Sequence, residues 1–271
     1  MRGRSTSGAM RIVSWNVNGL RAVAKKGFTD WLKAERADIV GLQETRVPVN
    51  DVPSELAKLE GFHTHFVAAE KAGYSGVGLY TRRPFDHVET TLGMKKFDEE
   101  GRFQLARFGR LIVVNAYFPN GSGQERDNSR VPYKLAFKKR IHKLLEEEKE
   151  KGTPIIVMGD WNTAPREIDI ARPKENAKTS GFLPEERKEM ERWYKTGWVD
   201  SFRHFNPDAK DRYSWWSQRF GVREKNVGWR IDLALVSPGA IPYLRNADIH
   251  HDVRGSDHCP ISVELDDAVI G

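Results

Sequence analysis

Short apolar segments recur along the chain, and each is followed or preceded by polar residues. The segments are four to eight residues long, rich in Val, Ile and Leu, and bounded by turn formers, a pattern that predicts buried β-strands. Polar side chains follow the first four segments, Asp232 lies inside the fifth, and Asp257 and His258 precede the sixth. The segments span residues 11–15, 38–42, 111–114, 154–158, 229–236 and 259–263.

Helical patterns alternate with some of these strands. Over residues 133–151, apolar side chains repeat at the helical period, and Gly152 is placed to end the helix. Further helices are predicted over residues 184–196 and 28–36. Because no repeat or long linker interrupts this alternation, we predict one layered α/β domain over residues 10–271. Residues 1–9 are predicted to be a disordered or non-native basic extension.

Composition narrows the classes to which the chain can belong. No apolar stretch approaches the roughly 20 residues that cross a bilayer, so a membrane role is not expected. Cys259 is the single cysteine, which leaves no internal disulfide and favours the cytoplasm. The net charge of +6 favours a polyanionic partner, although a basic protein without a nucleic-acid partner is an equally good reading of charge alone.

The polar residues at the strand ends suit a phosphate. Residues two apart in a strand point to the same side, so Asn16 with Asn18, and Asp160 with Asn162, each present two polar groups together. Asparagine amides donate hydrogen bonds to phosphate oxygens without adding charge. Carboxylates repel a phosphate unless a metal cation lies between them.

A metal site is predicted from strand-end residues that include four carboxylates. With one imidazole and no thiolate, this set favours a hard cation, Mg²⁺ or Mn²⁺, over zinc. Each residue alone is more often a turn former or a structural histidine, and only their joint occurrence indicates a composite active site. The residues are Glu44, Asp160, Asp232, Asp257 and His258.

Six motifs resemble, in this order, the exonuclease III family of apurinic/apyrimidinic (AP) endonucleases, within the endonuclease/exonuclease/phosphatase superfamily. The resemblance extends from about residue 10 to residue 266. Each motif alone is weak, but six in order are specific. They are Ser14-Trp-Asn-Val-Asn-Gly-Leu-Arg21, Leu42-Gln-Glu-Thr-Arg46, Gly73-Tyr-Ser-Gly76, Gly159-Asp-Trp-Asn-Thr163, Gly228-Trp-Arg-Ile-Asp232 and Gly255-Ser-Asp-His-Cys-Pro260.

The resemblance implies a deoxyribonuclease-I-like fold, a four-layered α/β sandwich with two mixed β-sheets packed face to face and flanked by helices. It implies a hydrolase of base excision repair that cuts the DNA backbone 5′ to abasic sites, with 3′→5′ exonuclease and 3′-end-cleaning activity. Mg²⁺ is the implied cofactor, and Mn²⁺ a substitute. The implied partner is double-stranded DNA with abasic or damaged sites, bound by a monomer associated with the nucleoid in the cytoplasm.

Family roles for the metal and the attacking water map onto five residues. By resemblance, Glu44 is the principal metal ligand, with Asp257 and Asn18 near the ion directly or through water. Asn18 stands where many members have Asp, which removes one charge from the site. Asp160, expected to stay ionised, positions or deprotonates the water, and Tyr117 contacts the phosphate or assists the leaving group.

Further family roles concern the scissile phosphate. By resemblance, Asn16, Asn162 and His258 hold this phosphate, and Asp232 orients His258. Hydrolysis adds an oxygen to an anionic phosphodiester, so the metal and His258 are expected to stabilise the charge of the transition state.

DNA recognition is expected from aromatic and basic residues. By resemblance, Trp215 and Trp229 wall the pocket that receives an extruded abasic sugar, while Trp216 is expected in the core. Trp215 replaces a Phe found in some members, which enlarges the wall. Arg219 matches a wedge position that enters the duplex. The loop 122–131, which contains Arg126 and Arg130, is expected to touch DNA, and a solvated charged loop is an equally good description of it. Expected backbone contacts are Lys71, Tyr74, Arg102, Asn120 and Arg126.

Two other functions stay open at this point. Another metal-dependent phosphoesterase of the superfamily would use a related site, and the match of residues 215–232 to the repair enzymes argues against it. A damaged-DNA-binding module would bind without cutting. Every catalytic-type position except Asn18 holds the expected residue, which favours an enzyme.

Overall fold

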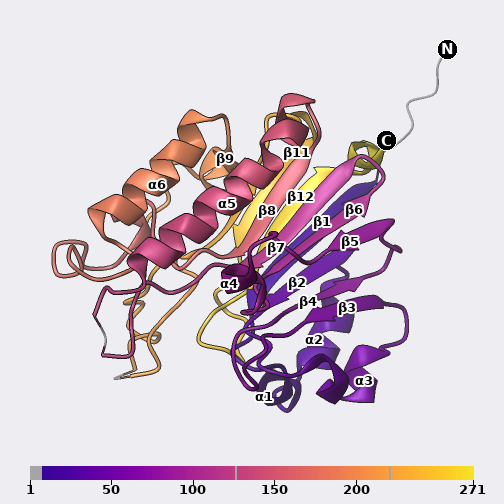
Figure 1. The fold of residues 1–271 in the computed structure, drawn as a ribbon, viewed down its shortest axis with the longest axis horizontal. Coiled ribbons are helices and arrows are strands. Elements are labelled where there is room, and N and C mark those ends of the chain that lie inside the picture. Colours follow the sequence, from indigo (N-terminus) through magenta and orange to yellow (C-terminus); the bar gives the residue numbers. More distant parts are fainter. Residues whose placement is uncertain (1–7, 126, 220) are drawn as a thin grey trace.

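Two mixed β-sheets pack face to face in the computed structural model, which describes residues 8–125, 127–219 and 221–271 (Figure 1). Within these residues each sheet has six strands. The first sheet has the order β11 (Leu244–Ile249), β12 (Ile261–Asp266), β1 (Ala9–Asn16), β2 (Ile39–Gln43), β4 (Val77–Thr81) and β3 (His63–Val67). The second has the order β5 (His87–Glu89), β6 (Phe103–Phe108), β7 (Leu111–Tyr117), β8 (Ile155–Asp160), β10 (Asp232–Val236) and β9 (Val199–Asp200).

Helices cover the outer face of each sheet. The helices α4 (Lys95–Asp98), α5 (Val131–Glu150) and α6 (Pro184–Lys195) share a buried cluster with the second sheet. The helices α1 (Leu20–Ala24), α2 (Phe28–Glu35) and α3 (Ser54–Ala57) share another with the first. The prediction of a four-layered α/β sandwich is confirmed (Figure 1). The other helical elements described are α7 (Ser201–Phe205) and 3₁₀ turns at Val49–Asp51, Glu167–Asp169, Ile241–Tyr243 and Asp267–Ile270.

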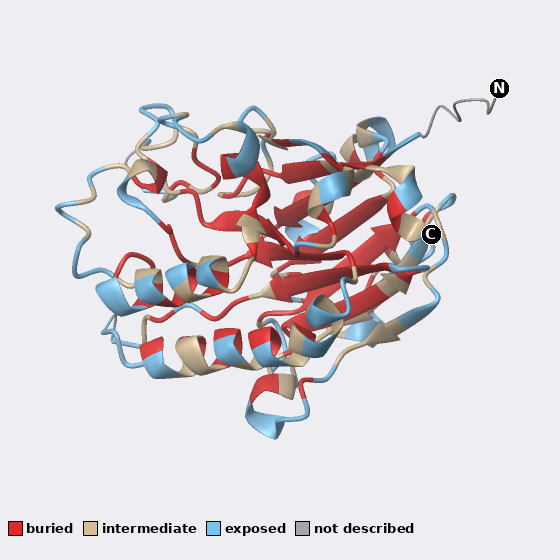
Figure 2. Cartoon of the chain, turned by 90° about the horizontal axis from the view of Figure 1, so that it is seen from above, coloured by how far each residue is buried: buried red, intermediate tan, exposed pale blue. Residues whose placement is uncertain are grey.

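The main core lies between the two sheets. Figure 2 shows strands buried through most of their length, while the helices carry exposed residues on their outer faces. Apolar side chains from both sheets belong to one buried cluster, and removing them from water is the main favourable contribution to folding. The cluster includes Ile12, Ile39 and Leu79 of the first sheet and Val113, Met158 and Val236 of the second.

Buried polar side chains join the sheets close to one end. Gln43 of β2 donates hydrogen bonds to Ser14 Oγ at 2.9 Å and to Asn115 Oδ1 of β7 at 2.7 Å. Asn115 donates in turn to Gln104 Oε1 at 3.0 Å and to the Leu42 carbonyl at 3.2 Å. Because these bonds cross from one sheet to the other in a buried region, they fix the relative position of the sheets.

Strand directions bring the polar ends together at this end of the sandwich. β1 and β2 are parallel, as are β7 and β8, so these four strands finish there. β10 runs antiparallel to β8, which places Asp232 opposite Asp160, and β12 runs antiparallel to β1. The residues that begin β10 and precede β12 therefore meet the residues that end the other four strands.

Several boundaries differ from the predicted ones. β10 begins at Asp232, because Trp229 pairs only through isolated bridges with Ile170 and Trp215. β1 already includes Ala9, one residue before the predicted start of the domain, and residues 1–7 of the predicted extension lie outside the described residues. In the part of the chain that is described, no helix combines the length and apolar character needed to cross a membrane.

His142 on α5 is expected to make the stability of the fold depend on pH. Burial, followed by the Arg192 charge, lowers the pKa of His142 from 6.5 to about 4. The unfolded chain therefore binds this proton near pH 6.5, but the folded chain does so only near pH 4. This residue should therefore cost the fold stability as the pH falls from 6.5 to 4.

The matched variants are His142→Gln and His204→Gln, the latter on the exposed side of α7. Urea unfolding at pH 7 and pH 4.5 should show a smaller loss of stability in His142→Gln than in the wild type. His204→Gln should behave as the wild type. Equal losses in all three proteins would show that His142 does not carry the acid sensitivity.

Candidate active site

Side chains from both sheets meet in a cleft at the shared end of the strands. The cleft has a volume of about 400 Å³. Asn16, Asp232 and His258 lie buried beneath it and contact its lining from within. The structure thus brings together the predicted catalytic and metal residues. The lining includes Asn18, Glu44, Tyr117, Asn120, Asp160, Asn162, Trp215, Trp229 and Asp257.

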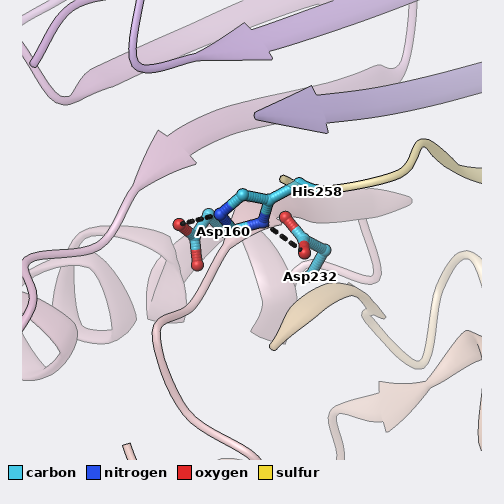
Figure 3. A group of neighbouring side chains, drawn as sticks. All are labelled: Asp160, Asp232 and His258. Carbon is cyan, nitrogen blue, oxygen red and sulfur yellow. Dashed lines mark hydrogen bonds and ion pairs between the residues drawn. The ribbon is translucent and has the colours of Figure 1, made fainter. Parts of the chain in front are cut away.

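His258 lies between two buried aspartates (Figure 3). Its Nδ1 is 2.8 Å from Asp232 Oδ2, and its Nε2 is 3.8 Å from Asp160 Oδ2. Burial alone would lower the pKa of His258, but the charges of Asp232 and Asp160 outweigh burial and raise the pKa to about 10. The imidazole is therefore a cation at neutral pH, with Asp232 fixing the orientation of its ring.

Asp160 is a buried carboxyl that faces His258. Burial raises its pKa to about 7 despite the opposing charge of His258. Asn16 Nδ2 donates to Asp160 Oδ2 at 2.9 Å, and the Asn162 backbone N–H donates to Oδ1 at 2.8 Å. A carboxyl with this pKa can exchange a proton near neutral pH. The expectation that Asp160 is ionised between a metal ion and His258 stays a prediction.

Glu44 accepts hydrogen bonds from a cation and an amide. Arg46 forms an ion pair with Glu44 and donates its Nε–H to Oε1 at 2.9 Å, while Asn16 donates to Oε2 at 3.0 Å. Asn16 is fully buried, and its amide already joins Glu44 to Asp160. The Asn16 amide therefore holds the two carboxylates in place, and its predicted contact with the phosphate stays a prediction.

Backbone strain also gathers in the cleft. Asn18, Glu44 and Asn162 have φ angles of 47°, 57° and 48°, in the left-handed region that residues other than glycine seldom occupy. Asn tolerates this region, but Glu does so less readily. Strained residues of this kind cluster where the surrounding structure fixes a functional geometry.

Two groups could hold a metal ion. The first group is Asp160, Asp232 and His258, three described residues whose ligand atoms all lie within 4.8 Å of one another. However, both nitrogens of His258 face carboxylates, and a metal there would displace its proton. Glu44 and Asp257 line the open cleft with oxygen atoms alone, the ligand type of hard cations. We favour this second group.

Tyr117 is tied to the site by Arg102. Burial, followed by the Glu44 charge, raises the pKa of Tyr117 well above 10, so its phenol stays protonated. The Arg102 guanidinium lies 4.6 Å from the Tyr117 ring, and it donates to the Tyr117 carbonyl at 3.1 Å and to Tyr74 Oη at 2.7 Å. Only 3% of Arg102 is exposed, and it also pairs with Glu100. The predicted direct DNA contact is not supported, because this guanidinium supports the two tyrosines from within.

Among the other predicted DNA contacts, Asn120 lines the cleft. Lys71, Asn120 and Arg219 are exposed, and Lys71 Nζ lies 5.5 Å from the centre of the half-buried Tyr74 ring. Arg126 lies outside the described residues.

The aromatic wall is formed by two tryptophans. Trp215 and Trp229 meet edge to face, with ring centres 5.9 Å apart. Trp216 is only 3% exposed, which confirms its predicted place in the core.

Lys134 was missed in the sequence. It is fully buried, pairs with Glu186 at 2.6 Å, and donates to the backbone carbonyl of Asn162. Lys138, one turn later, donates to Thr163 Oγ1 at 2.6 Å. Their positions in the sequence could have indicated that they are buried, because Lys134 and Lys138 lie at helical spacing with the apolar Ile141. Two cations on the apolar face of a helix indicate a buried polar partner.

The chain is similar to known nucleases in both sequence and fold. The model of the endonuclease/exonuclease/phosphatase family matches residues 13–258. The chain belongs to this family. Its relatives include an exodeoxyribonuclease of Bacillus subtilis (strain 168), 39% identical over 255 residues that cover 94% of this chain and 98% of the relative. A DNA-(apurinic or apyrimidinic site) endonuclease of Dictyostelium discoideum is 38% identical over 95% of this chain and 71% of the relative.

Solved structures agree with this family assignment. The AP endonuclease LMAP of Leishmania major superposes with a TM-score of 0.85 at 29% identity, over 95% of this chain and 88% of that one. The predicted fold, the resemblance to exonuclease III and the prediction of a hydrolytic DNA-repair nuclease are therefore confirmed. The family is one of metal-dependent nucleases, for which the cleft carboxylates are the candidate ligands.

Proposed function

We propose that the chain is an Mg²⁺-dependent phosphodiesterase that cuts the DNA backbone 5′ to abasic sites and also trims 3′ ends. The main support is the His258–Asp160 pair, a buried cation beside a proton-exchanging carboxyl at the base of the cleft. A cation there stabilises the charge that a phosphodiester gains during hydrolysis. The names of the relatives, an exodeoxyribonuclease and AP endonucleases, support damaged DNA as the substrate.

Glu44 and Asp257, with Asn18 beside them, are the residues proposed to hold the metal. Their oxygen atoms fit Mg²⁺ or Mn²⁺, and the ion pair of Glu44 with Arg46 supports a cation-binding role for this carboxylate. When bound, the ion would act as a Lewis acid toward the phosphate oxygens.

Each remaining residue has a role that follows from its partners. His258 donates its Nε2 proton to a phosphate oxygen, because Asp232 occupies Nδ1. Asp160 orients or deprotonates the attacking water once it has lost its own proton. Tyr117, protonated at neutral pH, donates to the phosphate or to the leaving oxygen. Asn162 lines the cleft and completes the phosphate site.

Recognition of the abasic site is assigned to the aromatic wall. Trp215 and Trp229 leave space for a sugar without a base, while Lys71, Tyr74, Asn120 and Arg219 contact the flanking DNA. The proposed active form is a monomer, working in the cytoplasm on DNA of the nucleoid.

The test is incision of end-labelled duplex DNA that carries one abasic analogue, with undamaged duplex in parallel. With Mg²⁺ we expect cleavage 5′ to the lesion, leaving a 3′-hydroxyl and a 5′ deoxyribose phosphate, and EDTA should abolish it. A ladder growing from the 3′ ends would measure the exonuclease activity. Folded protein that cuts neither duplex with Mg²⁺ or Mn²⁺ would exclude this proposal and favour another phosphodiester or DNA binding alone.

A further inference from the structure

Asp257 is held by donors on both of its carboxylate oxygens. Asn18 Nδ2 donates to Oδ1 at 2.9 Å, and Trp215 Nε1 donates to Oδ2 at 3.1 Å. Ser256 Oγ adds a longer bond to Oδ1 at 3.2 Å. Because the two main donors act on different oxygens, they fix both the position of the carboxylate and the rotation of its plane.

Other residues at these two positions would not donate to Asp257. Asp in place of Asn18, as in many family members, would be an acceptor when ionised, and Phe in place of Trp215, as in some members, has no N–H group. The paired arrangement therefore depends on both Asn18 and Trp215.

Trp215 also belongs to the aromatic wall of the cleft. Its ring meets Trp229 at 87°, and its centre lies 6.4 Å from that of His258. The indole thus donates its N–H to the proposed metal carboxylate and also lines the cleft that contains the proposed sugar pocket. A displacement of the ring would move a donor of Asp257.

We propose that Asn18 and Trp215 are a positioning pair for Asp257, and that their two hydrogen bonds to this carboxylate raise the affinity of the metal site. This inference rests on the proposed function, because it takes Asp257 as a residue of the metal site. Groups that orient a metal ligand commonly contribute 10- to 100-fold to metal affinity. Without the indole N–H, the carboxylate can rotate, and metal binding must then order it.

Trp215→Phe is the test, because it keeps an aromatic ring and removes the N–H. Binding of Mn²⁺ alone, followed by the electron paramagnetic resonance of the free ion, should weaken about tenfold. Trp229→Phe is the matched control, since it changes the same wall without removing a donor to Asp257. Its Mn²⁺ affinity should equal that of the wild type.

A second readout distinguishes orientation from general damage to the fold. In ¹H–¹⁵N spectra, the Trp215 indole signal, assigned by its absence from Trp215→Phe, should shift on addition of Mg²⁺ more than the Trp229 signal. Asn18→Asp should displace the Trp215 signal before any metal is added, because a second carboxylate would lie next to Asp257.

Different outcomes would contradict the proposed function and the positioning pair. Wild-type protein that neither binds Mn²⁺ nor cuts abasic DNA would contradict the proposed function itself. Wild-type protein that does both, with Trp215→Phe binding Mn²⁺ equally well or more tightly, would overturn the positioning pair alone. Equal weakening in Trp215→Phe and Trp229→Phe would also overturn it, because the effect would then belong to the wall and not to the hydrogen bond.

Discussion

His258→Ala should slow incision at an abasic site by at least about 10³-fold while leaving DNA affinity nearly unchanged. The variant removes the buried cation that faces Asp160, and with it the stabilisation of charge on the phosphate. Binding should survive because the expected DNA contacts are made by other side chains, which the variant leaves in place. Single-turnover cleavage measures the chemical step, and fluorescence anisotropy of an abasic duplex in EDTA measures affinity.

Two further variants test whether a loss of cleavage in His258→Ala could come from unfolding. Asp160→Asn keeps the shape of the side chain and should also lose most of its turnover, because an amide cannot accept a proton from water. His251→Ala removes an exposed imidazole from the loop before β12 and should cut at the wild-type rate. Near-wild-type cleavage by both His258→Ala and Asp160→Asn would remove these residues from the mechanism.

Lys134→Met should destabilise the fold by about 3–5 kcal/mol, the usual cost of leaving one member of a buried ion pair without its partner. The partner left behind is Glu186, which also accepts hydrogen bonds from the backbone N–H groups of Gly181 and Leu183. Cleavage should fall as well, since the carbonyl of Asn162 loses its donor. Urea unfolding monitored by circular dichroism measures the first effect.

A double variant separates stability from catalysis. Lys134→Met combined with Glu186→Gln removes the uncompensated charge and should recover most of the stability, but not the rate, because Asn162 still lacks its donor. Lys151→Met, at an exposed pair with Glu147 near the end of the same helix, should change neither. Recovery of both stability and rate in the double variant would assign Lys134 to stability alone.

The sequence was most informative where local pattern and chemistry coincide. The strand ends carrying Asn16, Glu44 and Asp160 could be located because each follows a short apolar segment, and their convergence follows from the fold that the motifs imply. Six described strands were missed: β3, β4, β5, β6, β9 and β11. Polar and charged residues weaken the apolar pattern of β3, β6 and β11, as in the sequence Phe-Gln-Leu-Ala-Arg-Phe of β6. β5 and β9 are only three and two residues long, and Gly78 interrupts β4.

The surroundings of a side chain were harder to predict from the sequence than its place at a strand end. Arg102 follows a run of acidic residues in the sequence, yet Tyr74 and Tyr117, which lie farther away along the chain, enclose it. The pKa of Asp160 likewise depends on how completely the surrounding elements exclude water, which no single motif records. Such properties arise from packing between segments distant in sequence.

The pairing of β1 with β12 has a consequence for the timing of synthesis. β1 is made long before the strand opposite it, because Ala9 faces Asp266. Until β12 is made, the nascent chain can pair β1 with β2 but not with its other neighbour. Because His258 comes shortly before β12, a copy that stops earlier lacks both this strand and the imidazole on which the proposed cleavage depends.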